Sequence, residues 1–486
     1  MLFNSNIFLF VFLPVVVLVF FPLVRRRASF ALGWLVVSSL FFYGWWNPSY
    51  LLLLGTSIVV GFWLARAATR SRLWVWVGLA FHLSGIAWFK YAGFLSAQLE
   101  SLTGWSAAVA PVALPLAISF FTFQQIAFLV DCGRGRAQEG RFLHYVLFVT
   151  FFPQLISGPI VHHREMIPQF EAGVRFRWTD VSVGLAFFAI GLFKKTVLAD
   201  GVAAHSSPIF DAAARGVPIG LAAGWTAALG YTLQLYFDFS GYSDMAIGLA
   251  RLFGIKLPLN FHSPLKSESI IEFWRRWHMT LSRFLRDYLY IPLGGSRHGS
   301  FRRALNLMVT MLLGGLWHGA AWSFVVWGGL HGFFLAVNHA FRRLKRRLGR
   351  ERLLPAPLGR PLAAGGTFVA VVVAFVIFRA ESLLVGLHVI VGMTGLRGLA
   401  GRAVEIEAGY WIVALLLIAW LMPNSQQLMR RHEPGIDIYG QLGEEPRWRI
   451  AWQPSLPWAL FILVLMAASL IAMMAEGHVE FLYRFF

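Results

Sequence analysis

The stretch LNLMVTMLLGGLWHGAAWSFVVWGGLHGFFLAVNHAF, residues 305–341, decides the fold class. It contains no Asp, Glu, Lys or Arg, and it is long enough for two membrane crossings, because a helix needs about 20 apolar residues to cross a bilayer. An imidazole inside such a run is costly unless it is hydrogen-bonded, and ionisable groups within a membrane are functional candidates by default. His318 is therefore the first candidate for a functional residue.

The rest of the chain is also strongly apolar and poor in charged residues. Of its 486 residues, 58% are hydrophobic and only 13% are charged, and the mean hydropathy is +0.64, which is too apolar for a soluble domain. Apolar runs recur to within a few residues of both ends, so no polar block is large enough to fold alone. We expect one membrane-embedded domain over residues 1–486, all-α and polytopic, with about ten to twelve transmembrane helices plus re-entrant and amphipathic helices.

The net charge of +19 comes from basic residues in short loops between apolar runs, as in RRLKRRLGRER at 342–352. The positive-inside rule places these loops in the cytoplasm, and the cluster Arg25–Arg27 after the first run places the N-terminus outside. Attraction to the anionic inner leaflet explains the charge, so we expect contact with the lipid bilayer and no nucleic acid partner. The single cysteine, Cys132, excludes an intramolecular disulfide and any CxxC motif.

Three stretches in the middle of the chain carry breaks or charges. Proline and glycine in PVALPLAISFF (111–121) and FFPQLISGPIVHH (151–163) predict broken helices that line an interior space. In YFDFSGYSDMAIG (236–248) we expect a helix to end and restart, with Ser or Asp as the cap. Asp238 and Asp244 are either a cap or an internal partner for an arginine, or catalytic carboxylates.

The stretch SIIEFWRRWHMTLSRFLRDYLYIPLGG (269–295) predicts an amphipathic helix with one apolar stripe. His278 lies on that stripe, so it is either a satisfied buried group or part of a site. Metal catalysis is disfavoured: no HExxH is present, the pair 162–163 has no third ligand at a recognisable spacing, and His318 and His331 would lie on different faces of one helix. We expect no metal. No GxSxG motif is present either.

These motifs resemble the membrane-bound O-acyltransferase family, specifically its bacterial alginate O-acetyltransferase branch. The resemblance covers nearly the whole chain and is carried by PLAISFFTFQQIAFLVD, FFPQLISGPIVHH, LYFDFSGYSDMAIGLARLFGIKLPLNFHSP, EFWRRWHMTLSRFLRDYLYIPLGG, LLGGLWHGAAWSFVVWGGLHG and FRA. It implies helices around a central tunnel, in which an acetyl group passes from a cytoplasmic thioester to a hydroxyl. The donor it implies is acetyl-CoA or an acyl carrier, as substrate, with no bound cofactor.

The resemblance also assigns residues. His318, in LWHG, is the expected general base that deprotonates the attacking hydroxyl, and burial favours the neutral imidazole that this role requires. His278, in WRRWH, is expected to orient the hydroxyl or to help hold the oxyanion, aided by an amide or indole N–H. The further candidates for the tunnel or for donor binding are Asp244, Trp274, Arg275, Trp277, Asn306 and Trp317.

In this branch the acetyl group is thought to continue to a periplasmic SGNH-type acetyltransferase that modifies an exopolysaccharide such as alginate. The expected location is the inner (cytoplasmic) membrane of a bacterium. Three alternatives stay open: D-alanyl transfer from a carrier protein to teichoic acid, a scaffold for a periplasmic enzyme, and a proton-coupled transporter with His318 and Asp244 as its relay. We find no internal repeat, which counts against a transporter.

Overall fold

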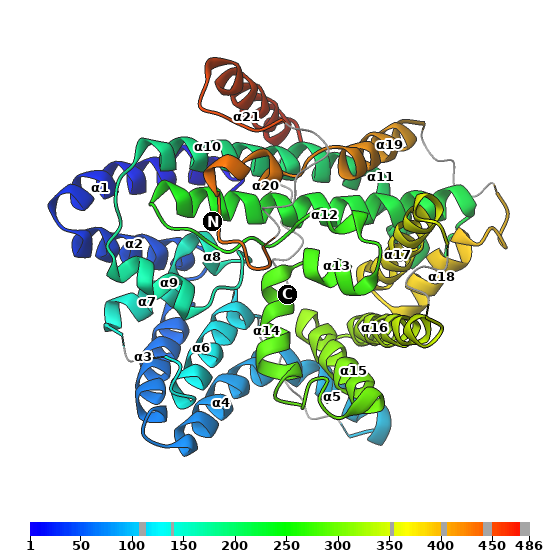
Figure 1. Cartoon of the computed structure of the whole chain (residues 1–486), viewed down its shortest axis with the longest axis horizontal. Coiled ribbons are helices and arrows are strands. Elements are labelled where there is room, and N and C mark those ends of the chain that lie inside the picture. The colour runs from blue at the N-terminus through cyan, green and yellow to red at the C-terminus, as the bar shows by residue number, and fades with distance from the viewer. Residues whose placement is uncertain (106–112, 138–139, 350–353, 400–405, 441–449, 477–486) are drawn as a thin grey trace.

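In the computed structural model, the described part of the chain consists of helices joined by loops (Figure 1). No β-strand occurs among the described residues, and this confirms the all-α prediction. Of the basic run 342–352, positions 350–352 lie outside the described part. The structure describes residues 1–105, 113–137, 140–349, 354–399, 406–440 and 450–476.

Many of the helices are long and apolar enough for a membrane, which confirms a multi-pass membrane protein. The expected number of crossings stays a prediction, because four apolar helices are shorter than a full span. The seven long candidates in the described residues are η1 with α1 (Phe8–Arg26), α3 (Tyr50–Ala68), α4 (Arg72–Ile86) continued by η2 (Ala87–Tyr91) and α5 (Ala92–Thr103), α10 (Trp178–Phe193) continued by η3 (Lys194–Ala199) and α11 (Asp200–Ala214), α16 (Trp322–Arg347), α17 (Ala356–Arg379) and α21 (Leu456–Glu476). The four shorter ones are α2 (Ala28–Gly44), α6 (Ile118–Gly133), α18 (Leu383–Met393) and α19 (Ile406–Leu421).

The stretch 305–341 forms two helices, as its length predicts. α15 (Gly299–His318) and α16 are joined by a short turn and pack against each other along their length. Glycines allow the close approach, since a Cβ atom at Gly315 or Gly328 would collide with backbone of the facing helix. The remaining helices of the described part are α7 (Phe142–Thr150), α8 (Phe152–Leu155), α9 (His163–Glu171), α12 (Leu221–Leu252), α13 (Ile270–Arg276), α14 (Met279–Leu285), α20 (Ser425–Leu428) and the short segments η4 (Pro264–Lys266), η5 (Arg286–Tyr290) and η6 (Arg430–His432).

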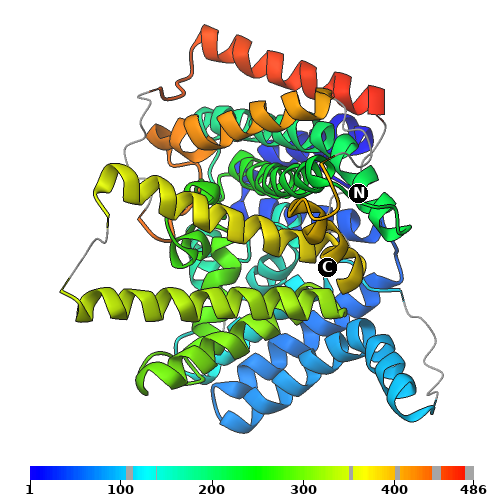
Figure 2. The ribbon, with the colours of Figure 1, turned by 90° about the vertical axis from the view of Figure 1, so that its right-hand side faces the viewer.

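Helix α12 lies across the middle of the molecule and is buried along most of its length (Figure 1). Helices α10 and α11 pack along it, and α17, α18 and α19 contact it as well. In the perpendicular view of Figure 2, α21 lies outermost beyond α19, and α15 and α16 lie on the opposite side of α12. Helices α10, α11, α17, α18 and α19 are therefore arranged around this one buried helix.

The expected break at 236–248 is wrong, because α12 continues through it without interruption. Gly241 and Gly248 of this stretch lie close to α10 instead of ending the helix. A Cβ atom at Gly191 would lie 2.6 Å from the carbonyl oxygen of Gly241, and one at Gly248 would lie 2.6 Å from that of Gly184. Only glycine permits this approach, so these residues set the contact between two helices.

The expected breaks are confirmed over 113–121 and 151–163, while residues 111–112 lie outside the described part. α6 begins after Ala117, which has φ +59°, and the chain between α8 and α9 is extended and buried, with Ser157 at φ +65°. Buried irregular backbone needs hydrogen bonds from its surroundings, and Ile160 N–H donates to the hydroxyl of Thr280 at 3.0 Å. Protein surrounds the segment between α8 and α9 and residues 115–121, whereas Ala113 is exposed. The tunnel that the two segments were expected to line stays a prediction.

Candidate active site

The stretch 269–295 is not one helix, and this corrects the prediction. It forms α13, α14 and η5, and the break falls at His278, which adopts the left-handed conformation with φ +42° and ψ +53°. This conformation costs a non-glycine residue about 1–3 kcal/mol and persists only where the surroundings impose it. The break turns the His278 side chain into the interior, where it is fully buried.

The residue that holds this turn is Asn260, from the loop after α12. Its Oδ1 accepts from the backbone N–H of Thr280 at 3.2 Å and from the Thr280 hydroxyl at 2.9 Å, and its Nδ2 donates to the hydroxyl of Ser243 at 3.2 Å. Nδ1 of His278 lies 3.2 Å from the same Oδ1. Since a backbone N–H only donates, Oδ1 is fixed as the oxygen, and Nδ1 of His278 carries the proton. The ring nitrogen of His278 that carries the lone pair is then Nε2.

His318 is the last residue of α15 and is 2% exposed. Its ring lies among aromatic rings, with centroids 4.8 Å from Trp317, 5.0 Å from Trp327 and 5.3 Å from Phe378. The ring of His278 lies 6.3 Å from the same Trp317 indole. The structure thus brings together both histidines that the sequence singled out, next to one shared indole.

A third buried histidine belongs to this group, and the sequence analysis set it aside. Nδ1 of His331 accepts from the indole N–H of Trp274 at 3.2 Å, and its ring lies 4.8 Å from that of Trp327, which also contacts His318. The spacing argument assumed one continuous helix, whereas the turn between α15 and α16 folds the two histidines toward each other. We call His278, Trp317, His318, Trp327 and His331 the histidine cluster.

The end of α15 is held by a different helix. Lys90 donates to the carbonyl oxygen of Trp317, and the Tyr91 hydroxyl donates to that of Leu316 at 2.7 Å. Both donors come from η2, a π-helical segment between α4 and α5, and such segments are frequent at functional sites. The last carbonyls of a helix have no partner within it, so these two side chains hold the end of α15, and with it the backbone of His318, in place.

The other predicted site residues lie in different surroundings. Asn306 donates to the carbonyl of Gly295 at 2.9 Å and stands twelve positions before His318, about 18 Å along α15. Asp244 binds Lys194 at 2.8 Å and accepts from Ser425 at 2.6 Å, so it has the expected internal partner, but a lysine rather than an arginine. Their proposed roles in a tunnel stay predictions.

The predicted residues on α13 and at the position after it have different surroundings. Trp274 contacts the cluster through His331, whereas Trp277 is buried against the rings of Phe273 and Phe375, and Arg275 is exposed at the end of the helix. Asn260 and Lys90 were not identified from the sequence. Both make contacts with residues that are distant in sequence. Asn260 lies within one of the motifs that carry the family resemblance, but nothing in that motif indicates which residue it contacts.

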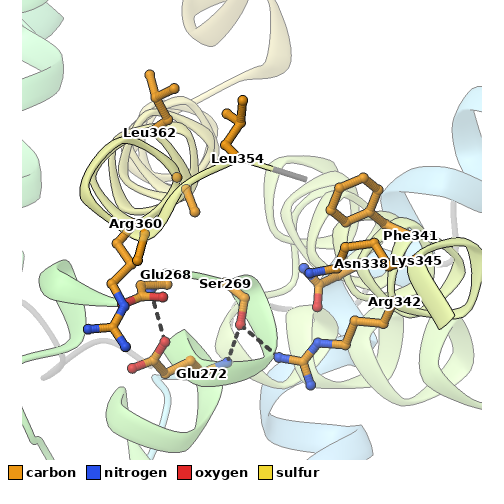
Figure 3. A pocket seen from close by; sticks show the side chains of 13 residues that line it. Glu268, Ser269, Glu272, Asn338, Phe341, Arg342, Lys345, Leu354, Arg360 and Leu362 are labelled. Atoms are coloured by element: carbon orange, nitrogen blue, oxygen red, sulfur yellow. Dashed lines mark hydrogen bonds and ion pairs between the residues drawn. The ribbon is translucent and has the colours of Figure 1, made fainter. Parts of the chain in front are cut away.

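A pocket of about 560 Å³ lies beside α13, between it, the second half of α16 and the start of α17 (Figure 3). Arg342 reaches across it to the hydroxyl of Ser269 at 3.2 Å, and Arg360 lies 3.7 Å from Glu268. Asn338 also lines it, about two helical turns along α16 from His331. Its volume is in the range of small-molecule sites, and its lining residues Glu272 and Asn338 come from the same helices as Trp274 and His331.

Comparison with known proteins places this geometry in a family. Residues 40–354 match the model of the membrane-bound O-acyltransferase family. The peptidoglycan O-acetyltransferase of Helicobacter pylori is 42% identical over 447 residues, which cover 85% of this chain and 83% of that protein. The probable alginate O-acetylase of Pseudomonas putida is 35% identical over 511 residues, which cover 99% of each chain.

The teichoic acid D-alanyltransferase of Streptococcus thermophilus is similar over a shorter region, with 29% identity over 286 residues that cover 54% of this chain and 68% of that protein. The family match spans more than half of the chain and includes every residue of the histidine cluster. The chain is therefore a multi-pass membrane O-acyltransferase that belongs to the membrane-bound O-acyltransferase family.

Proposed function

We propose that this protein transfers an acetyl group from acetyl-CoA to a hydroxyl acceptor and thereby serves the O-acetylation of a cell-surface polysaccharide. The observation that carries the proposal is the histidine cluster, in which two buried imidazoles, those of His278 and His318, contact one indole. The names of the relatives that match most of the chain support acetyl transfer over transfer of another acyl group.

In the proposed reaction His318 is the general base. It removes the proton of the attacking hydroxyl as the oxygen adds to the thioester carbonyl carbon. The tetrahedral intermediate then expels the thiolate, which takes the proton back from His318, so that an ester and a thiol leave. A thioester has a good leaving group, and a positioned base contributes roughly 10² to 10⁴ in rate.

His278 and the indoles are proposed to position the reactants and to stabilise the oxyanion. Nε2 of His278 carries a lone pair, which suits it to accept a hydrogen bond from the acceptor hydroxyl. The indole N–H groups of Trp317 and Trp327 are buried, and neither has a hydrogen-bond acceptor among the described residues. A donor fixed in a dry site is well suited to a developing negative charge, because it needs no reorganisation during the reaction.

The pocket beside α13 is the proposed docking place for the polar part of the donor. Its three basic lining residues, Arg342, Lys345 and Arg360, outnumber the two acidic ones, Glu268 and Glu272. The positive-inside rule assigns these basic helix ends to the cytoplasm. The pyrophosphate of a nucleotide thioester is anionic and suits such a lining. The acceptor would then approach from the other side, through a periplasmic SGNH-type acetyltransferase, with this protein in the inner membrane of a bacterium.

The test uses the full chain in nanodiscs with acetyl-CoA labelled in the acetyl group. Thioester consumption and label transfer, to a co-encoded periplasmic partner or to a glycan, are compared between wild type, His318→Ala and His278→Ala. Loss of the base should lower turnover by at least about 10²-fold. His388→Ala, a histidine of α18 outside the cluster, is the matched control and should keep wild-type turnover.

Retention of wild-type turnover by a folded His318→Ala protein would refute the assignment of the base. The donor is tested separately with a D-alanyl carrier protein in place of acetyl-CoA. Turnover with the carrier alone would identify the D-alanyl branch as the correct one, and the regional similarity to a teichoic acid D-alanyltransferase motivates this arm.

A further inference from the structure

A second pocket, of about 360 Å³, lies between the first turns of α15 and the last turns of α16, away from the histidine cluster. It is separate from the pocket beside α13, since no residue lines both. Its polar lining is basic: Arg303 comes from α15, and His339, Arg343 and Arg347 come from α16. No Asp or Glu lines it.

The arginines of this pocket differ from the buried basic residues elsewhere in the protein. Arg283 is paired with Glu165, and Lys194 is paired with Asp244. In contrast, Arg303, Arg343 and Arg347 have no side-chain hydrogen bond or ion pair with any other described residue. Three like charges that converge from two helices repel one another, so a bound anion would stabilise their arrangement.

The backbone adds to the preference for an anion. His339, Arg343 and Arg347 are four residues apart and therefore lie on one face of α16, which faces the beginning of α15. No side chain caps the N-terminus of α15, and no acidic residue lies in its first turn. The positive end of the helix dipole thus points to the same place as the arginines.

The pocket also has apolar lining residues, and these lie at the surface of the protein. Phe301 is 82% exposed and Leu344 is 52% exposed, and both line the pocket. α16 is long and apolar enough to cross a membrane, and α15 packs along it, so acyl chains of a surrounding bilayer would reach these exposed side chains. A ligand that fits both the basic and the apolar lining of this pocket has an anionic phosphate and long apolar chains.

We propose that this pocket, formed by Arg303, His339, Arg343 and Arg347, binds an anionic glycerophospholipid of the cytoplasmic leaflet. The phosphate lies among the arginines, and the acyl chains lie along Phe301 and Leu344. Basic pockets between transmembrane helices on the cytoplasmic side suit such headgroups. The bound lipid holds the start of α15 against the end of α16, the two helices that carry His318 and His331.

The experiment measures lipid retention by the full chain. The protein is taken from nanodiscs of equimolar phosphatidylcholine and phosphatidylglycerol into detergent, and mass spectrometry quantifies the two lipids that remain bound. The wild type should retain phosphatidylglycerol in preference. Each arginine near the phosphate contributes roughly fivefold, so Arg303→Gln with Arg343→Gln should reduce this preference by about 25-fold.

The matched control is Arg302→Gln with Arg346→Gln, which removes the same charge from exposed neighbours on the same helices. This control should keep the preference. An equal loss in both double variants would mean diffuse surface attraction and would overturn the proposal, as would a wild type without preference. Displacement of phosphatidylglycerol by inorganic phosphate, but not by sodium chloride of equal ionic strength, would identify a site for free phosphate and would also overturn it.

Discussion

At the residue scale, the unusual feature is a histidine in the left-handed conformation at the centre of a membrane protein. His278 takes this conformation because Asn260 fixes both its ring and Thr280, two positions further along the chain. The orientation of the imidazole and its proton position therefore depend on a side chain from another part of the chain. Asn260 is a positioning residue in the proposed mechanism, since it acts through His278.

We expect Asn260→Ala to lower kcat by about 10²-fold, with little change in KM for the donor, because a small displacement of His278 misplaces the acceptor hydroxyl. The loss of a buried acceptor for Thr280 should also lower the free energy of unfolding by about 1–3 kcal/mol. Asn260→Asp keeps the acceptor oxygen and should restore most of kcat. Ser243→Ala removes only the remote hydrogen bond, and a kcat loss equal to that of Asn260→Ala would refute this role.

At the element scale, helix ends and helix contacts decide where the site is. α15 ends at His318, and side chains of η2 donate to the two carbonyls before it, those of Leu316 and Trp317. The contact between α10 and α12 depends on four glycines whose backbones touch. Both features join elements that are distant in sequence.

Lys90→Met should reduce kcat by roughly 10- to 100-fold, because the carbonyl of Trp317 loses its donor and the end of α15 shifts. Lys90→Arg retains a donor and should rescue part of the activity, as measured by label transfer from acetyl-CoA. Lys266→Met is the matched control, since Lys266 also donates to a backbone carbonyl, that of Met422 at 2.9 Å. Activity of Lys90→Met at the level of this control would exclude the positioning role.

Gly191→Ala should lower the free energy of unfolding by about 1–3 kcal/mol, because the new methyl group would lie 2.6 Å from the Gly241 carbonyl oxygen. Gly366→Ala, in an open part of α17, should instead raise it by up to about 1 kcal/mol through helix propensity. Thermal unfolding in detergent, followed by fluorescence, gives the sign of each change. A stabilised Gly191→Ala protein would show that the two helices do not pack closely.

At the scale of the whole molecule, buried charges join the helices around α12. Lys195 in η3 binds Asp200 of α11 at 2.7 Å and Asp238 of α12 at 2.8 Å, and all three are almost fully buried. The carboxylates that the sequence analysis weighed as caps or catalytic groups thus connect neighbouring helices through lysines. Removing one member of such a group leaves an uncompensated buried charge.

Lys195→Met should therefore destabilise the fold by about 3–5 kcal/mol. Lys256→Met breaks an exposed pair with Glu433 and should cost less than about 1 kcal/mol. Denaturation of the two variants in the same detergent, compared with wild type, measures the difference. Equal stability of the two would mean that the buried group adds nothing to the fold.

The sequence by itself determined the class of the protein and two residues of its candidate site. Run length and composition require no knowledge of neighbours, so the helical membrane architecture and the division of 305–341 into α15 and α16 followed directly. His318 and His278 stood out because an imidazole in an apolar environment is costly wherever it lies.

Only the tertiary structure decided where helices break and which groups meet. Glycine and serine in 236–248 are compatible with either a helix break or a close helix contact, and packing against α10 gives the contact. The stretch 269–295 has the pattern of one helix, but the hydrogen bonds of Asn260 stabilise a break at His278. His331 joined the site through the fold between α15 and α16. Inside a membrane, backbone hydrogen bonds and charges must be satisfied by protein, so partners distant in sequence determine the outcome.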